Sequence, residues 1–480
     1  MSNYELIVGL EIHIQLNTKS KLFASDENKF GASANTNISS LTIALPGTLP
    51  KINEAAIEKA IQMGLATNCE IANYCFFDRK NYFYPDLPKG FQTTQDNEPI
   101  CTNGFLDVEV KNNVSKIRIN RIHMEEDAGK SIHDLDPENS FIDLNRAGTP
   151  LLELVTEPDI RTAQQAQQFV SKVRQIARYI EVSDGNMQEG SLRCDANISV
   201  RKIGETDLRN RVEVKNLNSL KFIRKAIEVE FERQVNLYED GKTVVQQTRG
   251  YNAENNTTFA QRDKEMAFDY RYFPEPDLPA IYIAKEKIDE LKNQLPALPD
   301  EVKQELKQVY GLTENDAEII AEQKELTQYF KAICKNVKNY KAASNWLIGS
   351  IKSHLNDKEI DITDFNISPE KIAEIIQLVD NQSISNTAAS TILFKELLEQ
   401  PKSDIKSLIN SLNLMLDSNE DSLIPIVDNV LNELSDKETV YKNGKKGLMG
   451  MFIGAVMKKS GGKANPKILQ QLIEKRINEQ

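Results

Sequence analysis

The chain has 480 residues and a formal net charge of −12, with 40% hydrophobic and 27% charged residues. This ordinary composition excludes collagen-like, coiled-coil and wholly disordered chains, and no apolar run approaches the roughly 20 residues of a membrane-spanning helix. The start of the chain lacks the features of a signal or transit peptide and the five cysteines fit no disulfide framework, so a cytoplasmic protein without membrane contact is expected.

Residues 1 to about 290 are predicted to combine strands with interspersed helices. Apolar and polar residues alternate over 10–16 and 192–200, and this period of two predicts strands. Residues 212–214 predict an antiparallel partner for the second of these strands. A change of phase predicts a β-bulge near Arg121. Helices are expected over 53–66, 162–180 and 219–239.

The remainder of the chain is predicted to be helical. Strand patterns stop at a proline-marked segment near 295–301, and Pro369 and Pro466 each follow a capping residue at the start of a helical pattern. A polar stretch near 400–404 is expected to separate two helical modules. The sequence therefore predicts an α+β protein: a mixed or antiparallel sheet domain over 1–290, an all-α domain over 291–402 and a small all-α tail over 403–480.

Charge is distributed unevenly along the chain. Residues 441–480 hold nine Lys and Arg against two Glu, a balance of +7 that leaves −19 for residues 1–440. A basic tail on an acidic body favours a polyanionic partner at that end. A solvated, lysine-rich helix would explain the same charge equally well.

Several carboxylates occupy unusual positions in the predicted strands. Glu11 and His13 are two residues apart, so both point to one face with Cα atoms roughly 6.8 Å apart. Three carboxylates follow one another at 125–127, and Glu153 lies inside an apolar run, where an unpaired charge is costly. A sheet that joined these segments would offer ligands suited to Mg²⁺. Alternatively, Glu11 and His13 lie on a solvated face and Glu153 pairs with an arginine such as Arg146.

Other patterns are weaker indicators of a binding site. Residues 77–89 and 269–277 combine aromatic and basic side chains, which suit phosphate and base contacts but also occur in packed loops. The polar strand face over 193–197 and 213–215 could form the floor of a cleft or simply meet water. P-loop, dinucleotide-binding, zinc-protease and serine-hydrolase signatures are absent, which decides against the usual kinases and hydrolases.

Segments in the same order along nearly the whole chain carry a resemblance to a known family. They are residues 8–13, 77–86, 123–130, 143–146, 148–151, 189–197, 269–277, 447–450 and 462–466. Together they closely resemble the GatB family, the B subunits of bacterial and organellar aspartyl/glutamyl-tRNA amidotransferases. The resemblance implies an N-terminal cradle domain, a helical domain and a helical tail that lies against tRNA.

The resemblance also implies a reaction and partners. ATP phosphorylates the side-chain carboxylate of Glu-tRNA(Gln) or Asp-tRNA(Asn), and ammonia then displaces phosphate, so the enzyme is a ligase that forms a carbon–nitrogen bond with glutamine as amido donor. Ammonia comes from glutamine on a separate amidase A subunit, and a small C subunit completes a heterotrimer. Two other hypotheses remain: a non-catalytic tRNA-binding scaffold, and a stand-alone metal-dependent hydrolase.

Site residues follow from the resemblance position by position. The metal-ligand candidates for Mg²⁺ are Glu11, His13, Glu126 and Glu153; the catalytic candidates are Glu125, Glu126 and Glu153; the candidates for contacts with the phosphates of ATP are Lys80, Lys130 and Arg193. Some relatives bind a structural zinc through paired CxxC motifs. Cys69, Cys75 and Cys101 do not have that spacing, which makes a zinc ion doubtful here.

Overall fold

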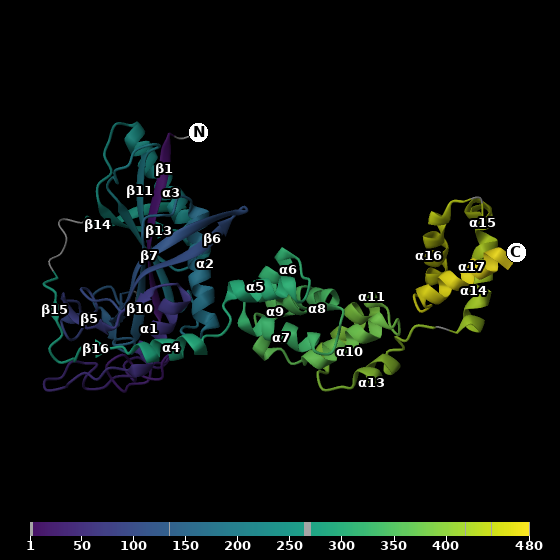
Figure 1. Cartoon of the computed structure of the whole chain (residues 1–480), viewed down its shortest axis with the longest axis horizontal. Coiled ribbons are helices and arrows are strands. Elements are labelled where there is room, and N and C mark those ends of the chain that lie inside the picture. Colours follow the sequence, from purple (N-terminus) through teal and green to yellow (C-terminus); the bar gives the residue numbers. More distant parts are fainter. Residues whose placement is uncertain (1–2, 134, 264–269, 418, 443, 480) are drawn as a thin grey trace. The chain divides into compact units, whose positions relative to one another are not determined.

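A computed structural model describes residues 3–133, 135–263, 270–417, 419–442 and 444–479. It separates into two compact units, Met1–Pro299 and Asp300–Gln480 (Figure 1). The first combines sheet and helices and the second is helical, which confirms the α+β class. The division between two helical modules near residue 402 stays a prediction, and Asp269 of the second aromatic segment lies outside the described residues. No helix in the described part of the chain has both the length and the apolarity to cross a membrane.

One large sheet dominates the first unit. Its strands lie in the order β14-β13-β12-β11-β1-β10-β7-β5-β4-β15, with β6 also on β7 and β2 on β6. They are β1 (Tyr4–Gln15), β2 (Glu70–Ile71), β4 (Asp78–Asn81), β5 (Phe91–Thr94), β6 (Cys101–Val110), β7 (Asn113–Glu126), β10 (Pro150–Thr156), β11 (Leu192–Lys202), β12 (Val212–Leu217), β13 (Gln247–Asn252), β14 (Thr257–Asp263) and β15 (Phe273–Pro274). Two further pairs are β3 (Tyr74–Cys75) with β16 (Ile281–Tyr282), and β8 (Lys130–Ile132) with β9 (Phe141–Asp143). The parallel pairing of β12 with β13 among antiparallel neighbours makes the sheet mixed.

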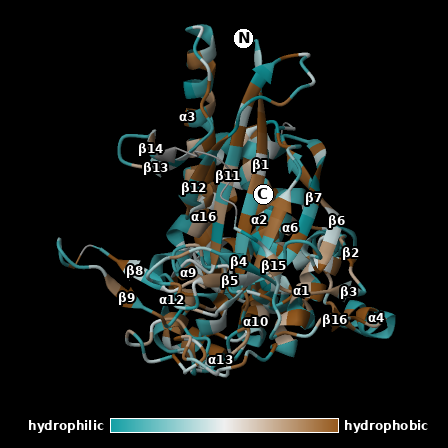
Figure 2. Ribbon diagram, turned by 90° about the vertical axis from the view of Figure 1, so that its left-hand side faces the viewer, coloured by the Kyte–Doolittle hydropathy of each residue, from teal (hydrophilic) through white to brown (hydrophobic). Residues whose placement is uncertain are grey.

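Strand β1 lies at the centre of the sheet, antiparallel to β10 on one side and β11 on the other. Its even-numbered side chains from Leu6 to Ile14 are buried in the apolar core, so its odd-numbered side chains point to the other face. Figure 2 shows hydrophobic and hydrophilic residues interleaved along such strands. The β-bulge predicted near Arg121 is confirmed, because the register between β7 and β10 shifts there.

Helices pack against the apolar face of this sheet. The three predicted helices are confirmed as α1 (Glu54–Ala66), α2 (Ala163–Tyr179) and α3 (Leu220–Glu239), and α4 (Lys285–Gln294) follows. Asn53, Thr162 and Ser219 start the first three, since each side chain accepts a hydrogen bond from a backbone N–H of the first turn. Buried residues of α1, α2 and α3 join the even-numbered side chains of β1 in one core. The odd-numbered side chains of β1 point to the opposite face of the sheet, where Glu11 and His13 line a cavity.

The second unit is built from short helices. They are α5 (Pro299–Gln308), α6 (Glu314–Ala321), α7 (Lys324–Cys334), α8 (Tyr340–Trp346), α9 (Lys352–Lys358), α10 (Pro369–Asp380), α11 (Asn386–Ala388), α12 (Phe394–Glu399), α13 (Ile405–Ser411), α14 (Glu420–Glu433), α15 (Ser435–Lys442), α16 (Met449–Lys459) and α17 (Pro466–Glu479). Helices α10 and α17 begin at the predicted prolines. Helices α14, α16 and α17 share an apolar core that includes Val427, Phe452 and Leu469.

Candidate active site

Three neighbouring strands place acidic and imidazole side chains in one row on the open face of the sheet. His13 in β1 lies opposite Glu153 in β10, and Glu153 lies opposite His123 in β7. Glu125 is two residues beyond His123 in the same strand, so both side chains point to the same face. Strand pairing therefore brings His13 to residues that are more than a hundred positions away in the sequence.

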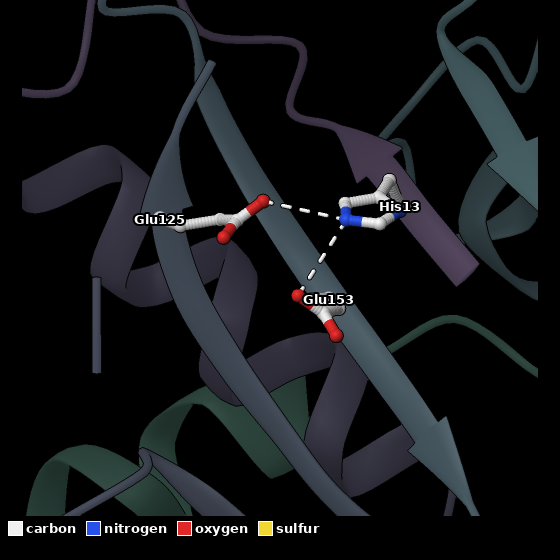
Figure 3. A group of neighbouring side chains, drawn as sticks. All are labelled: His13, Glu125 and Glu153. Carbon is white, nitrogen blue, oxygen red and sulfur yellow. Dashed lines mark ion pairs between the residues drawn. The ribbon is translucent and has the colours of Figure 1, made fainter. Parts of the chain in front are cut away.

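His13, Glu125 and Glu153 form a compact cluster, here called the His13 group (Figure 3). His13 Nε2 lies 3.5 Å from Glu125 Oε1 and 3.5 Å from Glu153 Oε2. One ligand atom from each of the three residues lies within 4.8 Å of the others. His123 contacts the cluster through Glu153, with its Nε2 atom 3.3 Å from Glu153 Oε2.

The electrostatics of the His13 group favour positive charge. Burial raises the pKa of the Glu125 carboxyl, and the charge of Glu153 raises it further. Burial would also raise the pKa of Glu153, but the charge and hydrogen bonding of His123 and the hydrogen bond with His13 lower it well below its usual range. Burial alone would lower the pKa of His13, yet hydrogen bonding to Glu153 and the charges of Glu153 and Glu125 raise it to about 9.

A second carboxylate cluster lies beside the first. It consists of Glu11, Asp195 and Glu213, here called the Glu11 group, and Glu11 lies directly opposite Asp195 in the pairing of β1 with β11. Lys215 Nζ lies 3.0 Å from Asp195 Oδ2 and 2.9 Å from Glu213 Oε1. Burial, followed by the charges of Glu153 and Glu213, raises the pKa of Glu11. The Glu11 group thus contains its own cation.

Both groups line one cleft with a cavity volume of about 710 Å³. Its other lining side chains include the cations Lys80, Arg193 and Arg211 and the aromatic residues Tyr82 and Tyr270. Lys80 Nζ lies 4.9 Å from the centroid of the Tyr270 ring, and Arg193 Nη2 donates a hydrogen bond of 2.9 Å to an oxygen of Asp127. Of the polar strand face that the sequence indicated as a possible cleft floor, Arg193, Asp195, Glu213 and Lys215 line this cleft.

The donor set of the His13 group fits a hard divalent cation. Neighbouring ligands of octahedral Mg²⁺ lie about 3 Å apart, because its bonds are about 2.1 Å long. The separations of 3.5 Å from His13 to the two carboxylates are close to this value. His123 contacts the Oε2 atom of Glu153 and so orients that carboxylate, which is a common role for residues behind a metal ligand. His13, Glu125 and Glu153 could therefore hold Mg²⁺, with water as the remaining ligands.

Two residues expected in the site lie elsewhere. Glu126 Oε1 accepts a hydrogen bond of 2.8 Å from the backbone N–H of Thr93 and pairs with Lys89. Successive strand residues point to opposite faces, so Glu126 points away from the side on which Glu125 meets His13. Lys130 is exposed in β8, and neither residue lines the cleft. This geometry does not support Glu126 as a metal ligand or Lys130 as a phosphate contact.

Two residues that contact the candidate site residues, His123 and Asp127, were not identified from the sequence patterns. His123 was not recognised as a partner of Glu153, although its spacing of two from Glu125 already indicates that both share a face. Asp127 was not recognised as a partner for arginines. The suggested pairing of Glu153 with Arg146 is wrong, because Arg146 lies 3.3 Å from Asp127 and Glu153 pairs with the two histidines.

Comparisons with known proteins bear on this site. A family model described as the GatB/GatE catalytic domain matches residues 6–289, and one described as the GatB domain matches residues 328–477. The chain is 43% identical over 474 residues to the B subunit of the aspartyl/glutamyl-tRNA(Asn/Gln) amidotransferase from Chlorobium luteolum, covering 99% of both chains. The chain belongs to the GatB family.

Other GatB-family proteins are similar over the same extent. The corresponding protein of Persephonella marina is 44% identical over 472 residues, covering 98% of this chain and 99% of its own. That of Leptospira biflexa is 44% identical over 477 residues, covering 98% and 97%. The first family model includes every residue of the His13 and Glu11 groups, so both groups lie within the part of the GatB fold that is described as catalytic.

Proposed function

We propose that this chain is the B subunit of a glutamine-dependent tRNA amidotransferase. Its cleft would use ATP to activate the side-chain carboxylate of Glu-tRNA(Gln), Asp-tRNA(Asn) or both. The observation that carries this proposal is the chemistry of the cleft, which is lined by the acidic side chains of the His13 and Glu11 groups and by several cationic side chains. No Ser, Thr or Cys is among the described residues that line it. Such a site suits phosphoryl transfer, which needs positioning and charge neutralisation more than an enzyme nucleophile.

The reaction proceeds in two steps. An oxygen of the substrate carboxylate attacks the γ-phosphorus of ATP, the bond to the β-phosphate oxygen breaks, and an acyl phosphate and ADP result. Ammonia then attacks the acyl carbon, phosphate leaves with the electrons of the C–O bond, and the nitrogen loses a proton to give the amide. Activation comes first because a carboxylate has no leaving group that ammonia can displace.

The chain's own side chains have separate roles in this proposal. Mg²⁺ held by His13, Glu125 and Glu153 would neutralise charge on the transferring phosphoryl group. Lys80 and Arg193 line the same cleft and would bind phosphate oxygens. Because Arg193 already donates to an aspartate, its guanidinium is held in place before substrate binds. The tyrosines at 82 and 270 would limit the access of water to the acyl phosphate.

The proposal includes partner subunits. Glutamine must be opened by an activated nucleophile, and the described residues of the cleft supply none. Ammonia would therefore come from a separate amidase A subunit, with a small C subunit completing a cytoplasmic heterotrimer that is a carbon–nitrogen ligase. A scaffold or a stand-alone hydrolase would not consume ATP in a way that depends on misacylated tRNA.

The test uses the chain assembled with its A and C partners. ATP, glutamine and either Glu-tRNA(Gln) or Asp-tRNA(Asn) are supplied, and ADP and amide formation are measured together. We expect ADP formation to require misacylated tRNA and to stop when EDTA removes the metal, and the chain alone to show no glutaminase activity. Tightly coupled amide formation that persists after Glu125 and Glu153 are both changed to Gln would favour the scaffold. Substrate cleavage without ATP would favour the hydrolase.

The tail is proposed to contact the tRNA through a subset of its basic residues. Three of them already have acidic partners, in the pairs Lys442–Glu438, Lys459–Glu433 and Arg476–Asp428. The positive charge available to a partner is therefore smaller than the balance of +7 over residues 441–480 indicates. Among the described residues, no ion pair involves Lys445, Lys458, Lys463, Lys467 or Lys475.

Paired and unpaired lysines allow a controlled test of this role. Changing Lys458 and Lys463 to Gln should weaken binding of misacylated tRNA to the assembled enzyme and reduce the salt slope of log affinity by about 1 per lost phosphate contact. The matched control changes Lys442 and Lys459, which already have acidic partners, and should have the smaller effect. Equal affinities and salt slopes for both double variants would leave the tail with a solubilising role only.

A further inference from the structure

Lys80 is held in the cleft in a different way from two other cations that line it. Arg193 donates a hydrogen bond to Asp127, and Lys215 Nζ lies 3.0 Å from Asp195 Oδ2. Among the residues that the structure describes, Lys80 forms no ion pair. Its close partners are aromatic rings instead.

Two tyrosine rings lie beside the ammonium of Lys80. Its Nζ atom is 4.9 Å from the ring centroid of Tyr270 and 5.9 Å from that of Tyr82. Both distances are within the roughly 6 Å over which the face of an aromatic ring attracts a cation. The two ring centroids are 6.1 Å apart with an angle of 69° between the planes, a favourable edge-to-face arrangement.

An aromatic partner and a carboxylate partner have different consequences for an ammonium. A carboxylate cancels the positive charge, whereas a ring face attracts the ammonium and leaves its charge available to an anion. The lysine side chain is long and flexible, so fixing it before a substrate binds lowers the entropic cost of binding. Burial raises the pKa of the Glu125 carboxyl, and the positive charge of Lys80 is one of the influences that oppose this rise. The charge of Lys80 therefore acts on the His13 group.

The two tyrosines come from segments that are far apart in the sequence. Tyr82 follows Lys80 by two residues, whereas Tyr270 precedes β15, which pairs with β4 (Figure 2). The backbone N–H of Asn81 donates to Tyr270 O at 3.0 Å, and Asn81 Nδ2 donates to Arg271 O at 2.8 Å. Arg271 has a φ of 46°, in the left-handed region that arginine seldom adopts. Asn81 thus stabilises an unfavourable turn directly after Tyr270.

A second contact fixes the same segment to β4. Arg79 Nε donates to Glu275 Oε2 and Arg79 Nη2 donates to Glu275 Oε1, both at 2.7 Å, and Glu275 is buried. Such a bidentate pair fixes geometry as well as adding binding energy. Arg79 and Asn81 flank Lys80 in β4, so their side chains point away from the side on which Lys80 lies. One side of the strand therefore anchors the segment that carries Tyr270, and the other presents Lys80 to the cleft.

We propose that Tyr270 is a positioning residue, whose ring together with that of Tyr82 holds the charged ammonium of Lys80 in the cleft for phosphate oxygens of the reaction. This inference rests on the proposed function, because it assumes that Lys80 meets phosphate there. Tyr270 acts through Lys80 and needs no contact with a substrate for this role. The anchoring by Asn81 and Arg79 sets the place of the ring before any substrate binds.

The test changes the charge distribution of the ring at nearly constant size. Phenylalanine, or phenylalanine with one, two or three ring fluorines, replaces Tyr270 in the full chain assembled with its A and C partners. Fluorine withdraws electron density from the ring face and so weakens its attraction for a cation. The same series is made in Lys80→Met, and kcat/KM for ATP is measured with misacylated tRNA and glutamine. Tyr282→Leu, at a 79% exposed position of β16 outside the cleft, is the control.

We expect kcat/KM to fall stepwise with each fluorine, by roughly tenfold from phenylalanine to the ring with three fluorines. Lys80→Met should lower kcat/KM by about a hundredfold, and the fluorine series should then be flat. Tyr270→Leu should cost about tenfold in the wild-type chain and less than about twofold in Lys80→Met, because residues that act as a unit are not additive. The control should match the wild type.

Two outcomes would overturn this inference. A flat fluorine series in the chain that contains Lys80 would mean that the charge distribution of the ring has no role. The same decline in Lys80→Met would mean that the ring acts on something other than this ammonium. In both cases wild-type amidation driven by ATP would leave the proposed function intact, whereas its absence would remove both.

Discussion

The His13 group and the Glu11 group lie on the same sheet face but are neutralised in different ways. In the Glu11 group, Lys215 lies within 3.0 Å of Asp195 and 2.9 Å of Glu213, and an ammonium remains charged at neutral pH. In the His13 group the two carboxylates lie within 3.5 Å of imidazole nitrogens of His13 and His123. An imidazole can give up its proton and become a metal ligand, so metal binding competes with protonation.

The different partners, a lysine in one group and imidazoles in the other, indicate which group is better suited to bind a divalent cation. The raised pKa of His13, about 9, means that the group attracts a proton when no metal is present. A cation that replaced this proton would neutralise both carboxylates at once. In the Glu11 group the fixed ammonium already serves that purpose and would repel a cation. We therefore expect the tighter metal site in the His13 group.

The largest effect is expected from Glu153→Gln. Glu153 contacts both His13 and His123, so loss of its charge should abolish tight Mn²⁺ binding and slow ATP-dependent amidation on the order of 10³-fold. Electron paramagnetic resonance of free Mn²⁺ and turnover by the assembled enzyme measure the two effects. Glu157→Gln is the control, since Glu157 follows the same strand but does not line the cleft. Normal turnover by Glu153→Gln would show that the site is elsewhere.

A smaller and more selective effect is expected from the neighbours Glu125 and Glu126. Glu125→Gln should weaken Mn²⁺ binding by about tenfold or more, because one of three ligands loses its charge. Glu126→Gln should leave Mn²⁺ affinity unchanged and lower the free energy of unfolding by about 1–3 kcal/mol, because the largely buried Lys89 loses its charged partner. Metal titration and chemical denaturation separate the two variants. The reverse pattern would restore Glu126 as the ligand and exclude Glu125.

The smallest effect is expected from Lys215→Met. Without the ammonium, Glu11, Asp195 and Glu213 become three carboxylates with no cation of their own, and they should bind a second, weaker Mn²⁺. Turnover should fall only a few-fold at saturating Mg²⁺, since the His13 group is intact. Lys202→Met, at an exposed position of β11, is the control. An unchanged Mn²⁺ stoichiometry would mean that the lysine is not what distinguishes the two groups.

Much of the sheet and its helices could be predicted because the signals are local. Alternation along β1 and β11 follows from the pleat of a strand, and α1, α2 and α3 begin at residues that cap a helix with their own side chains. The β-bulge near Arg121 was readable as a change of phase in one strand. Membership of the GatB family was likewise readable from motifs in order along the chain.

Only the tertiary structure decided how these elements act together. Which of Glu125 and Glu126 meets His13 depends on the pairing of β7 with β10 and of β10 with β1. A shift of one residue would exchange their faces, and local sequence does not specify that register. Lys215 pairs with Asp195, twenty residues away in the sequence, and Lys459 of α16 pairs with Glu433 of α14. Such contacts depend on distance in space, which the order of residues along the chain does not record.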